Sequence, residues 1–306
     1  MTQKNATLDL ISYDCGWGCG DYGCQDGPEK ADLSGLSEAL RGAGYNTILS
    51  DLKLRELGDR SQYKTKYETY PMTVQSVTKL AERCANDIKS EVVPVVIGGD
   101  HSSAIGTWSG VISALGAHKK FGLIWIDAHM DAHTPETSNE GKWGGWWHGM
   151  PVAALTGQGD NAFRHLMDQD QKINPKHITL MGIRSFEPGE EAYVEQNEIY
   201  CYKARDVHTV GFEAALKESI EYIEKECDFF GVSIDLDGFD PEDAPGVGTP
   251  EKYGIKASEA VPALRGISQH PKFKGLEVVE YNPHNGEDGI TRGLIHDLVN
   301  EIFAKD

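Results

Sequence analysis

The chain has 306 residues, of which 29 are basic and 48 acidic, so its net charge at pH 7 is −19. This excess of negative charge disfavours nucleic acid and anionic membranes as partners. Hydrophobic residues make up 39% of the chain, which is enough for a sizeable core. Because the sequence has neither a signal-peptide pattern nor an apolar run of about 18 residues, we expect a soluble, cytoplasmic protein without a membrane partner.

Short apolar runs alternate with helical patterns along the chain, and no linker or low-complexity segment divides it. Strands separated by helices are joined by right-handed crossovers, which produce a parallel sheet covered by helices on both faces. We therefore expect one α/β domain over residues 1–306, a three-layer α/β/α sandwich around a central, mainly parallel sheet. Its eight strands are predicted near residues 6–13, 46–50, 92–97, 121–127, 177–183, 199–203, 229–235 and 275–280.

Six cysteines are scattered through the chain, and three of them, Cys15, Cys19 and Cys24, lie in a glycine-rich segment. Their spacing matches no common zinc signature, and a chain of this size does not depend on disulfides. We interpret all six as reduced thiols. A redox role or adventitious metal binding by the first three is the alternative.

The strand predicted at 121–127 ends in three metal-ligating side chains. Residues 121–126 carry no polar side chain, as is typical of a central parallel strand, and Asp127, His129 and Asp131 follow at every second position. If the extended backbone continues past the strand end, these three side chains point the same way. Carboxylates and an imidazole that converge in apolar surroundings favour a bound cation over a plain polar loop.

Two other predicted strands end in the same manner. Residues 229–234 lead into Asp235 and Asp237, and residues 92–97 lead into a glycine pair followed by His101, which opens a predicted helix. Six ligands exceed what one cation needs and suit two cations bridged by shared carboxylates. The six candidate metal ligands are His101, Asp127, His129, Asp131, Asp235 and Asp237.

These strand ends resemble the signature motifs of the arginase/agmatinase (ureohydrolase) superfamily, at residues 98–102, 127–131 and 233–241. The resemblance extends almost from end to end, from residues 20–24 to 279–283, and is closest to arginase. It implies an arginase-like fold, in which sites form at the carboxyl ends of the strands. It also implies a homo-oligomer, either a trimer or a hexamer.

The resemblance further implies a binuclear metal centre, with two Mn²⁺ ions per chain as the family expectation and Ni²⁺ or Co²⁺ as alternatives. The ions would activate a water molecule for attack on a guanidinium carbon, and Asp131 would pass a proton to the leaving nitrogen. Asp127 and Asp235 would bridge the ions. The other ligands would be divided in pairs, His101 with Asp131 and His129 with Asp237.

Three residues outside the ligand set receive roles from the same resemblance. Glu280 would pair with the substrate guanidinium, and Thr249 would line the same pocket. His148, which precedes Gly149, would move protons at the mouth of the site. The alternatives are a buried ion pair between Glu280 and an internal arginine and a purely structural role for His148.

The chain departs from the usual arginase pattern in the loop at 132–147 and shortly after it. His133 stands where arginases commonly carry Asn, Glu140 lies near an expected Ser, and Glu187 replaces an Asp. A loop of this length in a compact domain is usually functional. These departures affect which substrate the site would bind, and not the reaction that it would catalyse.

We expect a small guanidino substrate, L-arginine, cleaved to urea and L-ornithine. Ser138 and His133 can donate hydrogen bonds to its carboxylate, while Glu187 and Glu190 can accept them from its α-ammonium. The alternative is another ureohydrolase, acting on agmatine, a guanidino acid or guanidine. A catalytically inactive paralogue would be expected to have lost metal ligands, and this sequence keeps all six.

Three tryptophans of the loop, Trp143, Trp146 and Trp147, allow three interpretations. They can form a lid that attracts a guanidinium through cation–π contacts. They can instead contact a neighbouring subunit, or simply pack at the surface.

Overall fold

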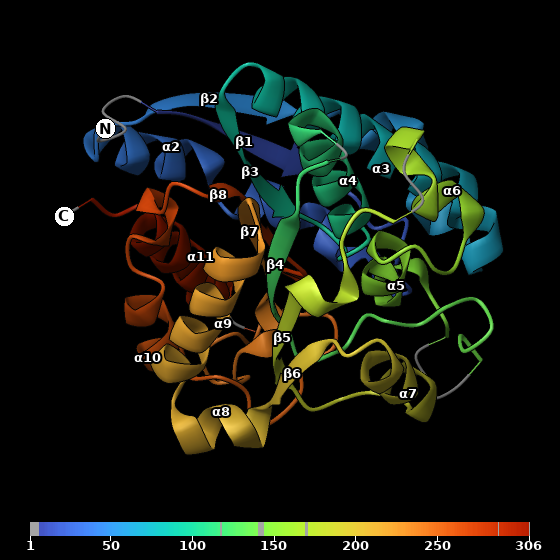
Figure 1. Cartoon of the computed structure of the whole chain (residues 1–306). Coiled ribbons are helices and arrows are strands. Elements are labelled where there is room, and N and C mark those ends of the chain that lie inside the picture. Colours follow the sequence, from blue (N-terminus) through green and yellow to red (C-terminus); the bar gives the residue numbers. More distant parts are fainter. Residues whose placement is uncertain (1–5, 117, 140–143, 169–170, 287, 306) are drawn as a thin grey trace.

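The computed structural model describes residues 6–116, 118–139, 144–168, 171–286 and 288–305. The fold is built around one sheet of eight strands (Figure 1). The strands are β1 (Thr7–Tyr13), β2 (Asn46–Asp51), β3 (Val92–Gly98), β4 (Phe121–Ile126), β5 (Ile178–Ile183), β6 (Tyr200–Lys203), β7 (Phe229–Asp235) and β8 (Phe273–Val279).

All neighbouring strands run parallel, in the order β2-β1-β3-β8-β7-β4-β5-β6. The predicted α/β/α fold and all eight predicted strands are therefore confirmed. Strand β8 begins at Phe273, two residues before the predicted start.

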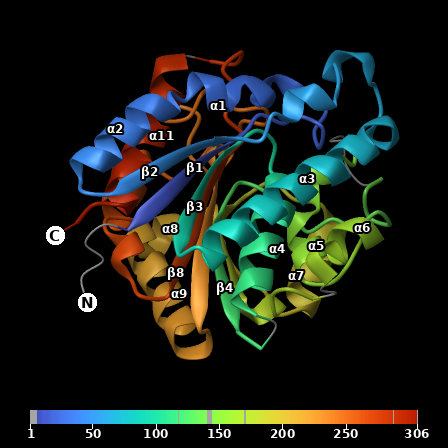
Figure 2. The ribbon, with the colours of Figure 1, turned by 90° about the horizontal axis from the view of Figure 1, so that it is seen from above.

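Helices cover both faces of the sheet (Figure 2). On one face lie α2 (Leu33–Gly42), α8 (Ala204–Val210), α9 (Phe212–Glu226), α10 (Ala257–Ala263) and α11 (Asp288–Ile302). On the other face lie α3 (Lys66–Lys89), α4 (Ser103–Leu115), α5 (Pro151–Leu155) and α7 (Pro188–Gln196). The shortest helices are α1 (Gly27–Lys30) and α6 (Asn161–Arg164). No helix in these described ranges is long and apolar enough to cross a membrane.

The core consists of two main apolar layers that are separated by the sheet. Adjacent residues of a strand point to opposite faces, so Ile124 of β4 joins the layer under α9 to α11, whereas Trp125 joins the layer under α3 and α4. Leu10 and Ile11 of β1 divide in the same way. Burial on both faces explains why the central strands are continuous apolar runs.

The turn after β3 differs from the prediction in one respect. Helix α4 begins at Ser103, so His101 lies in the turn before the helix and does not open it. The turn passes very close to a neighbouring loop, because a Cβ atom at Gly99 would lie 1.7 Å from the carbonyl oxygen of Cys15. The glycine thus lets the chain turn tightly between β3 and His101.

Gly231 of β7 provides a test of the packing between the sheet and α4. A Cβ atom there would lie 2.1 Å from Cζ3 of the fully buried Trp108. Gly231→Ala should therefore lower the free energy of unfolding by about 1–3 kcal/mol, as overpacking of a core usually does, and urea denaturation would measure this loss. Gly275→Ala is the matched control, because its Cβ would meet the same ring at 3.6 Å and its nearest atoms, in Pro94, at 3.3 Å. An equal loss in both variants would contradict the packing argument.

Candidate metal centre

The carboxyl ends of the central strands open into a cavity of about 240 Å³. In parallel sheets, side chains from several strand ends meet at this edge. Two of the candidate ligands, His101 and Asp127, are almost completely buried beneath the cavity. The cavity wall itself is formed by other predicted site residues, namely His129, Asp131, His133, His148, Glu187, Glu190, Asp235, Asp237, Thr249 and Glu280.

His101 is surrounded by three carboxylates. Its Nδ1 lies 3.2 Å from Oδ2 of Asp127, and it lies 3.1 Å from both Oδ2 of Asp131 and Oδ2 of Asp235. All four side chains are buried. They come from the ends of β3, β4 and β7 and from the loop after β4, so the fold unites residues that are up to 134 positions apart.

A second group of ligands shares Asp127 with the first. Nδ1 of His129 lies 3.2 Å from Oδ2 of Asp237 and 3.5 Å from Oδ1 of Asp127. Asp127 thus presents one carboxylate oxygen to His101 and the other to His129, which is the arrangement of a carboxylate that bridges two cations. The ligand atoms lie within 4.8 Å of one another in each of two groups, His101 with Asp127 and Asp235, and Asp127 with His129 and Asp237.

The backbone after β4 does not remain extended, contrary to the expectation. The strand ends at Ile126, and Asp131 adopts a left-handed conformation with φ of 49°. The backbone carbonyl of Asp131 accepts a hydrogen bond of 2.9 Å from the amide of Val152. The side chains therefore converge from a bent loop, with bends at residues 128 and 129 and a left-handed residue at Asp131, and not from alternation along a straight strand.

The charges of this centre are strongly coupled. Burial and the nearby Asp127 carboxylate raise the pKa of Asp131 to about 7. Burial lowers the pKa of His101, but hydrogen bonds to the three surrounding carboxylates outweigh this effect and raise it well above its usual range. The buried carboxylates therefore require positive charge among them, which either protons or divalent cations can supply. Four carboxylates and two imidazoles form a donor set that fits two divalent cations.

Two buried residues that we did not predict hold His101 in place. Nε2 of His101 lies 2.9 Å from Oγ of Ser233, and this hydroxyl donates to Oε1 of Glu277 over 2.7 Å. The imidazole also stacks on Trp125 with ring centroids 4.1 Å apart. Because these two hydrogen bonds fix Nε2 of the ring, Nδ1 is the nitrogen that faces the three carboxylates.

The sequence contains a partial signal for these two residues. Ser233 stands two positions before Asp235 in an apolar strand, and it therefore points to the same side as the ligand. Glu277 is a single acid inside the apolar run of β8. Their contact depends on the register of β7 and β8, which pairs Ser233 directly with Glu277.

Glu280 and His148 lie together above the metal ligands. Oε1 of Glu280 accepts a hydrogen bond of 2.8 Å from the amide of His101 and lies 3.2 Å from Nδ1 of His148. The ion-pair partner of Glu280 in the described part of the chain is thus a histidine and not an internal arginine. Burial lowers the pKa of His148, but its hydrogen bond to Glu280 raises it overall. Thr249 lines the same cavity and donates to Oδ2 of Asp237 over 2.8 Å.

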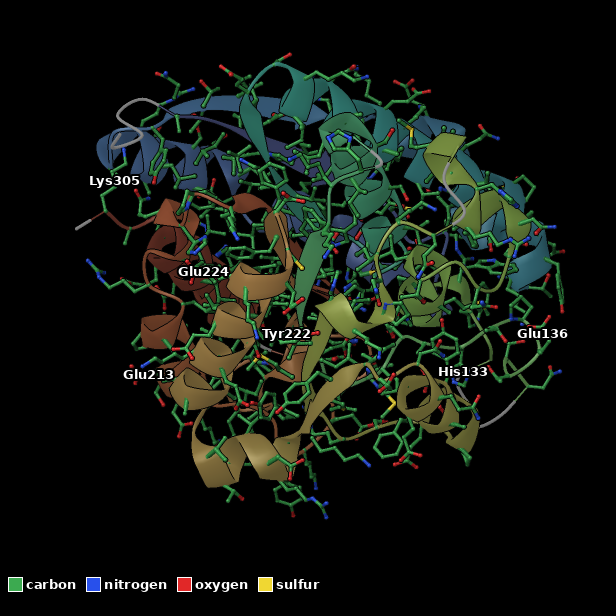
Figure 3. The ribbon with its side chains drawn as sticks, viewed as in Figure 1. His133, Glu136, Glu213, Tyr222, Glu224 and Lys305 are labelled. Carbon is green, nitrogen blue, oxygen red and sulfur yellow. The ribbon has the colours of Figure 1, made fainter. Side chains whose placement is uncertain are left out.

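The predicted substrate-binding residues are brought together only in part. His133 lies beside the start of α7 (Figure 3), and its Nε2 is 3.1 Å from both Oε2 of Glu187 and Oε2 of Glu190. Ser138 does not join them. Its hydroxyl accepts from Nζ of Lys66 over 2.9 Å and donates to the carbonyl of Pro135 over 2.7 Å, and it does not line the cavity.

The tryptophans of the loop have different environments. Trp147 is 5% exposed and packs against Tyr70 and Phe163, with ring centroids 5.0 and 5.5 Å away. This packing excludes Trp147 from a lid. Trp146 is half-buried beneath the guanidinium of Arg60, which lies 5.2 Å from its ring centroid. Trp143 and Glu140 lie outside the described residues.

The six cysteines are free thiols, as expected. Cys19 and Cys24 lie close together, with their sulfur atoms 3.6 Å apart, and Cys19 lines the cavity. Burial raises the pKa of the thiol of Cys15 well above its usual range. This thiol is therefore protonated and unreactive at neutral pH.

Comparisons with known proteins agree with this geometry. The family model described as the Arginase family matches residues 8–304. An arginase of Bacillus subtilis is 33% identical over 305 residues, which cover 98% of each chain. The crystal structure of arginase from Bacillus subtilis superposes with a TM-score of 0.89 at 30% identity over 99% of both chains. The structure of Entamoeba histolytica arginase in complex with L-ornithine gives a TM-score of 0.86 at 28% identity over 100% of both chains.

The contact between Ser233 and His101 predicts a loss of metal affinity on substitution. Ser233→Ala should weaken binding of divalent cations by about 10- to 100-fold, because the ring of His101 loses the partner that orients it. Equilibrium dialysis against Mn²⁺ would measure the change. Ser103→Ala is the matched control, because Ser103 donates to Glu277 over 3.3 Å without touching His101. Unchanged affinity in Ser233→Ala would show that the contact does not position the ligand.

Proposed function

The chain belongs to the arginase family, and we propose that it hydrolyses the guanidinium group of L-arginine to urea and L-ornithine. Members of this family are ureohydrolases that depend on a binuclear metal centre. The observation that supports this substrate class best is that one cavity is lined by four of the six candidate ligands, His129, Asp131, Asp235 and Asp237, and also by Glu280. A buried carboxylate of this kind suits a guanidinium, because the two can form paired, charge-assisted hydrogen bonds.

We assign two divalent cations to the six candidate ligands, with Mn²⁺ as the expected ion and Ni²⁺ or Co²⁺ as alternatives. When bound, the two ions would lower the pKa of water at the site, so that hydroxide is available near neutral pH. The shared position of Asp127 between His101 and His129 supports this assignment.

The chain's own residues would then orient the substrate and move protons. Glu280 would hold the guanidinium, and the amide of His101 fixes the direction of its carboxylate. Asp131, on the cavity wall, would carry a proton to the leaving amine. The side chain of His148 is 20% exposed, so it can exchange protons between the site and solvent.

The part of the cavity wall formed by His133, Glu187 and Glu190 would bind the amino-acid end of the substrate. Glu187 and Glu190 offer carboxylates for the α-ammonium, and His133 offers a donor for the carboxylate. Ser138 is engaged by Lys66 and would have to reorient to serve the same carboxylate.

We further propose that residues 1–306 form one catalytic domain, which works in the cytoplasm as a homo-oligomer, a trimer or a hexamer. Membership of the family supports the assembly. The net charge of −19 supports a small-molecule substrate over a nucleic acid.

One observation favours a second candidate, a ureohydrolase whose substrate has no α-ammonium. His133 already lies 3.1 Å from both carboxylates that would accept the ammonium. If the imidazole keeps these contacts when substrate binds, a guanidino acid such as 4-guanidinobutyrate, or agmatine or guanidine, would fit better than arginine.

Steady-state urea release from these four compounds by the metal-replete enzyme tests the choice. We expect the highest kcat/KM for L-arginine. Glu187→Gln should raise KM for arginine far more than for 4-guanidinobutyrate, because 4-guanidinobutyrate has no α-amino group for Glu187 to bind. Glu191→Gln is the control, because Glu191 pairs with Lys203 away from the cavity. A higher kcat/KM for any of the other three compounds would replace the arginase proposal with the second candidate.

The proton-transfer role of His148 predicts a specific kinetic effect. His148→Asn should lower kcat by about ten- to a thousand-fold, the range expected when a positioned acid or base is lost. Its metal content should not change, because His148 contacts Glu280 and is not a candidate ligand. Turnover assays combined with metal analysis would test both statements. Normal turnover, or loss of metal, would argue for a structural role.

A further inference from the structure

A third group of metal-ligating side chains lies on the cavity wall, apart from the six candidate ligands. It consists of His133, from the loop after β4, and Glu187 and Glu190, from the start of α7. Nε2 of the histidine is 3.1 Å from one oxygen of each glutamate. The three ligand atoms lie within 4.8 Å of one another.

The imidazole of His133 is oriented by its other nitrogen. Nδ1 lies 2.9 Å from Oγ1 of Thr137, and this hydroxyl donates its own proton to the carbonyl of Thr134 over 3.3 Å. The hydroxyl is therefore the acceptor for the Nδ1 proton, and Nε2 is the nitrogen that faces the two carboxylates. A metal-binding histidine is typically held in this way, with one nitrogen anchored and the other directed at the ion.

The two glutamates are also placed before any ligand binds. Glu190 is 3% exposed, and its carboxylate accepts hydrogen bonds from the amides of Ala132 over 3.1 Å and Glu187 over 3.3 Å. The side chain of Glu187 is 28% exposed and forms part of the cavity wall. The group thus has a rigid, buried side and a side that is open to the cavity.

The spacing of these atoms suits a small divalent cation. Ligand atoms of a tetrahedral Zn²⁺ ion, each about 2.0–2.1 Å from the metal, lie about 3.3–3.4 Å from one another. The nitrogen–oxygen distances of 3.1 Å are only a few tenths of an ångström shorter. Three protein ligands with one position left open to a cavity is a common arrangement for zinc.

We propose that His133, Glu187 and Glu190 bind a third divalent cation, for which Zn²⁺ is the best match, and that this cation competes with the α-ammonium of the substrate. The competition follows because both cations need the same two carboxylates and repel each other at such short range. Zinc bound here would therefore inhibit turnover of an α-amino acid. The competition rests on the proposed function, whereas the cation site does not.

Counting bound zinc tests the site directly. Equilibrium dialysis of metal-free protein against Zn²⁺, followed by elemental analysis, should give three ions per chain for the wild type and for Glu191→Gln. Glu191 lies on the same helix but pairs with Lys203. His133→Asn and Glu187→Gln should each bind two ions. Saturation of the wild type at two ions, or retention of the third ion by Glu187→Gln, would overturn the site.

His133 is buried, so His133→Asn is informative only if it folds, which circular dichroism and thermal denaturation would establish. Glu187→Gln keeps the proposal testable in either case, because the Glu187 side chain is partly exposed and glutamine keeps an oxygen that can accept the capping hydrogen bond from the amide of Glu190. A wild type that saturates at two ions would mean that a proton, and not a metal ion, balances the two carboxylates.

The competition is tested separately, by comparing two substrate-like compounds at the same concentration of free Zn²⁺. Saturating L-ornithine should weaken binding of the third zinc ion by at least tenfold, whereas 5-aminopentanoate, which keeps the carboxylate that His133 would bind but lacks the α-amino group, should weaken it much less. Equal effects of the two compounds would overturn the competition. A protein that binds three zinc ions but releases urea from no guanidino compound would overturn only the proposed function. Urea release by a protein that saturates at two ions would overturn only the third site.

Discussion

The structure depends on one electrostatic constraint, the concentration of buried negative charge at the carboxyl ends of β3, β4 and β7. Asp127, Asp131 and Asp235 lie around a single imidazole, and Asp237 lies beside a second one. Such a cluster is unfavourable in an apolar setting unless positive charge compensates it. Divalent cations supply that charge more effectively than protons do, and they release the protons as they bind. Metal binding and the stability of this region should therefore be linked.

The scaffold around the centre limits how far these charges can move. The sheet is packed on both faces, so the strand ends are fixed by two apolar layers. Behind the centre, Ser233 and Glu277 anchor the ring of His101 from within the sheet, and Trp125 stacks on it. Preorganisation of this kind is what a binuclear centre needs, because metal ligands that are already in place lose little conformational entropy when the ions bind.

The cavity is lined by two groups of charged side chains. At one end lie candidate metal ligands, and Glu280 lies beside His148 there. At the far end a histidine lies between two glutamates, and the neighbouring Ser138 is turned away towards Lys66. In the proposed function, the reaction chemistry is thus separate from the recognition of the rest of the substrate. Changes at the far end can alter the substrate, or create a further cation site, without disturbing the metal ligands.

The sequence by itself determined the eight strands and the six candidate ligands that the fold brings together, because apolar runs and ligand-type side chains are local properties of the chain. It did not determine that the loop after β4 is bent and that Asp131 adopts a left-handed conformation, with its carbonyl bonded to the distant amide of Val152. Tertiary structure alone decided that Ser233 meets Glu277, that Trp147 packs into the interior, and that His133 lies between two glutamates more than 50 residues away. These contacts join distant parts of the chain, and their geometry depends on strand register and helix position, which no local pattern encodes.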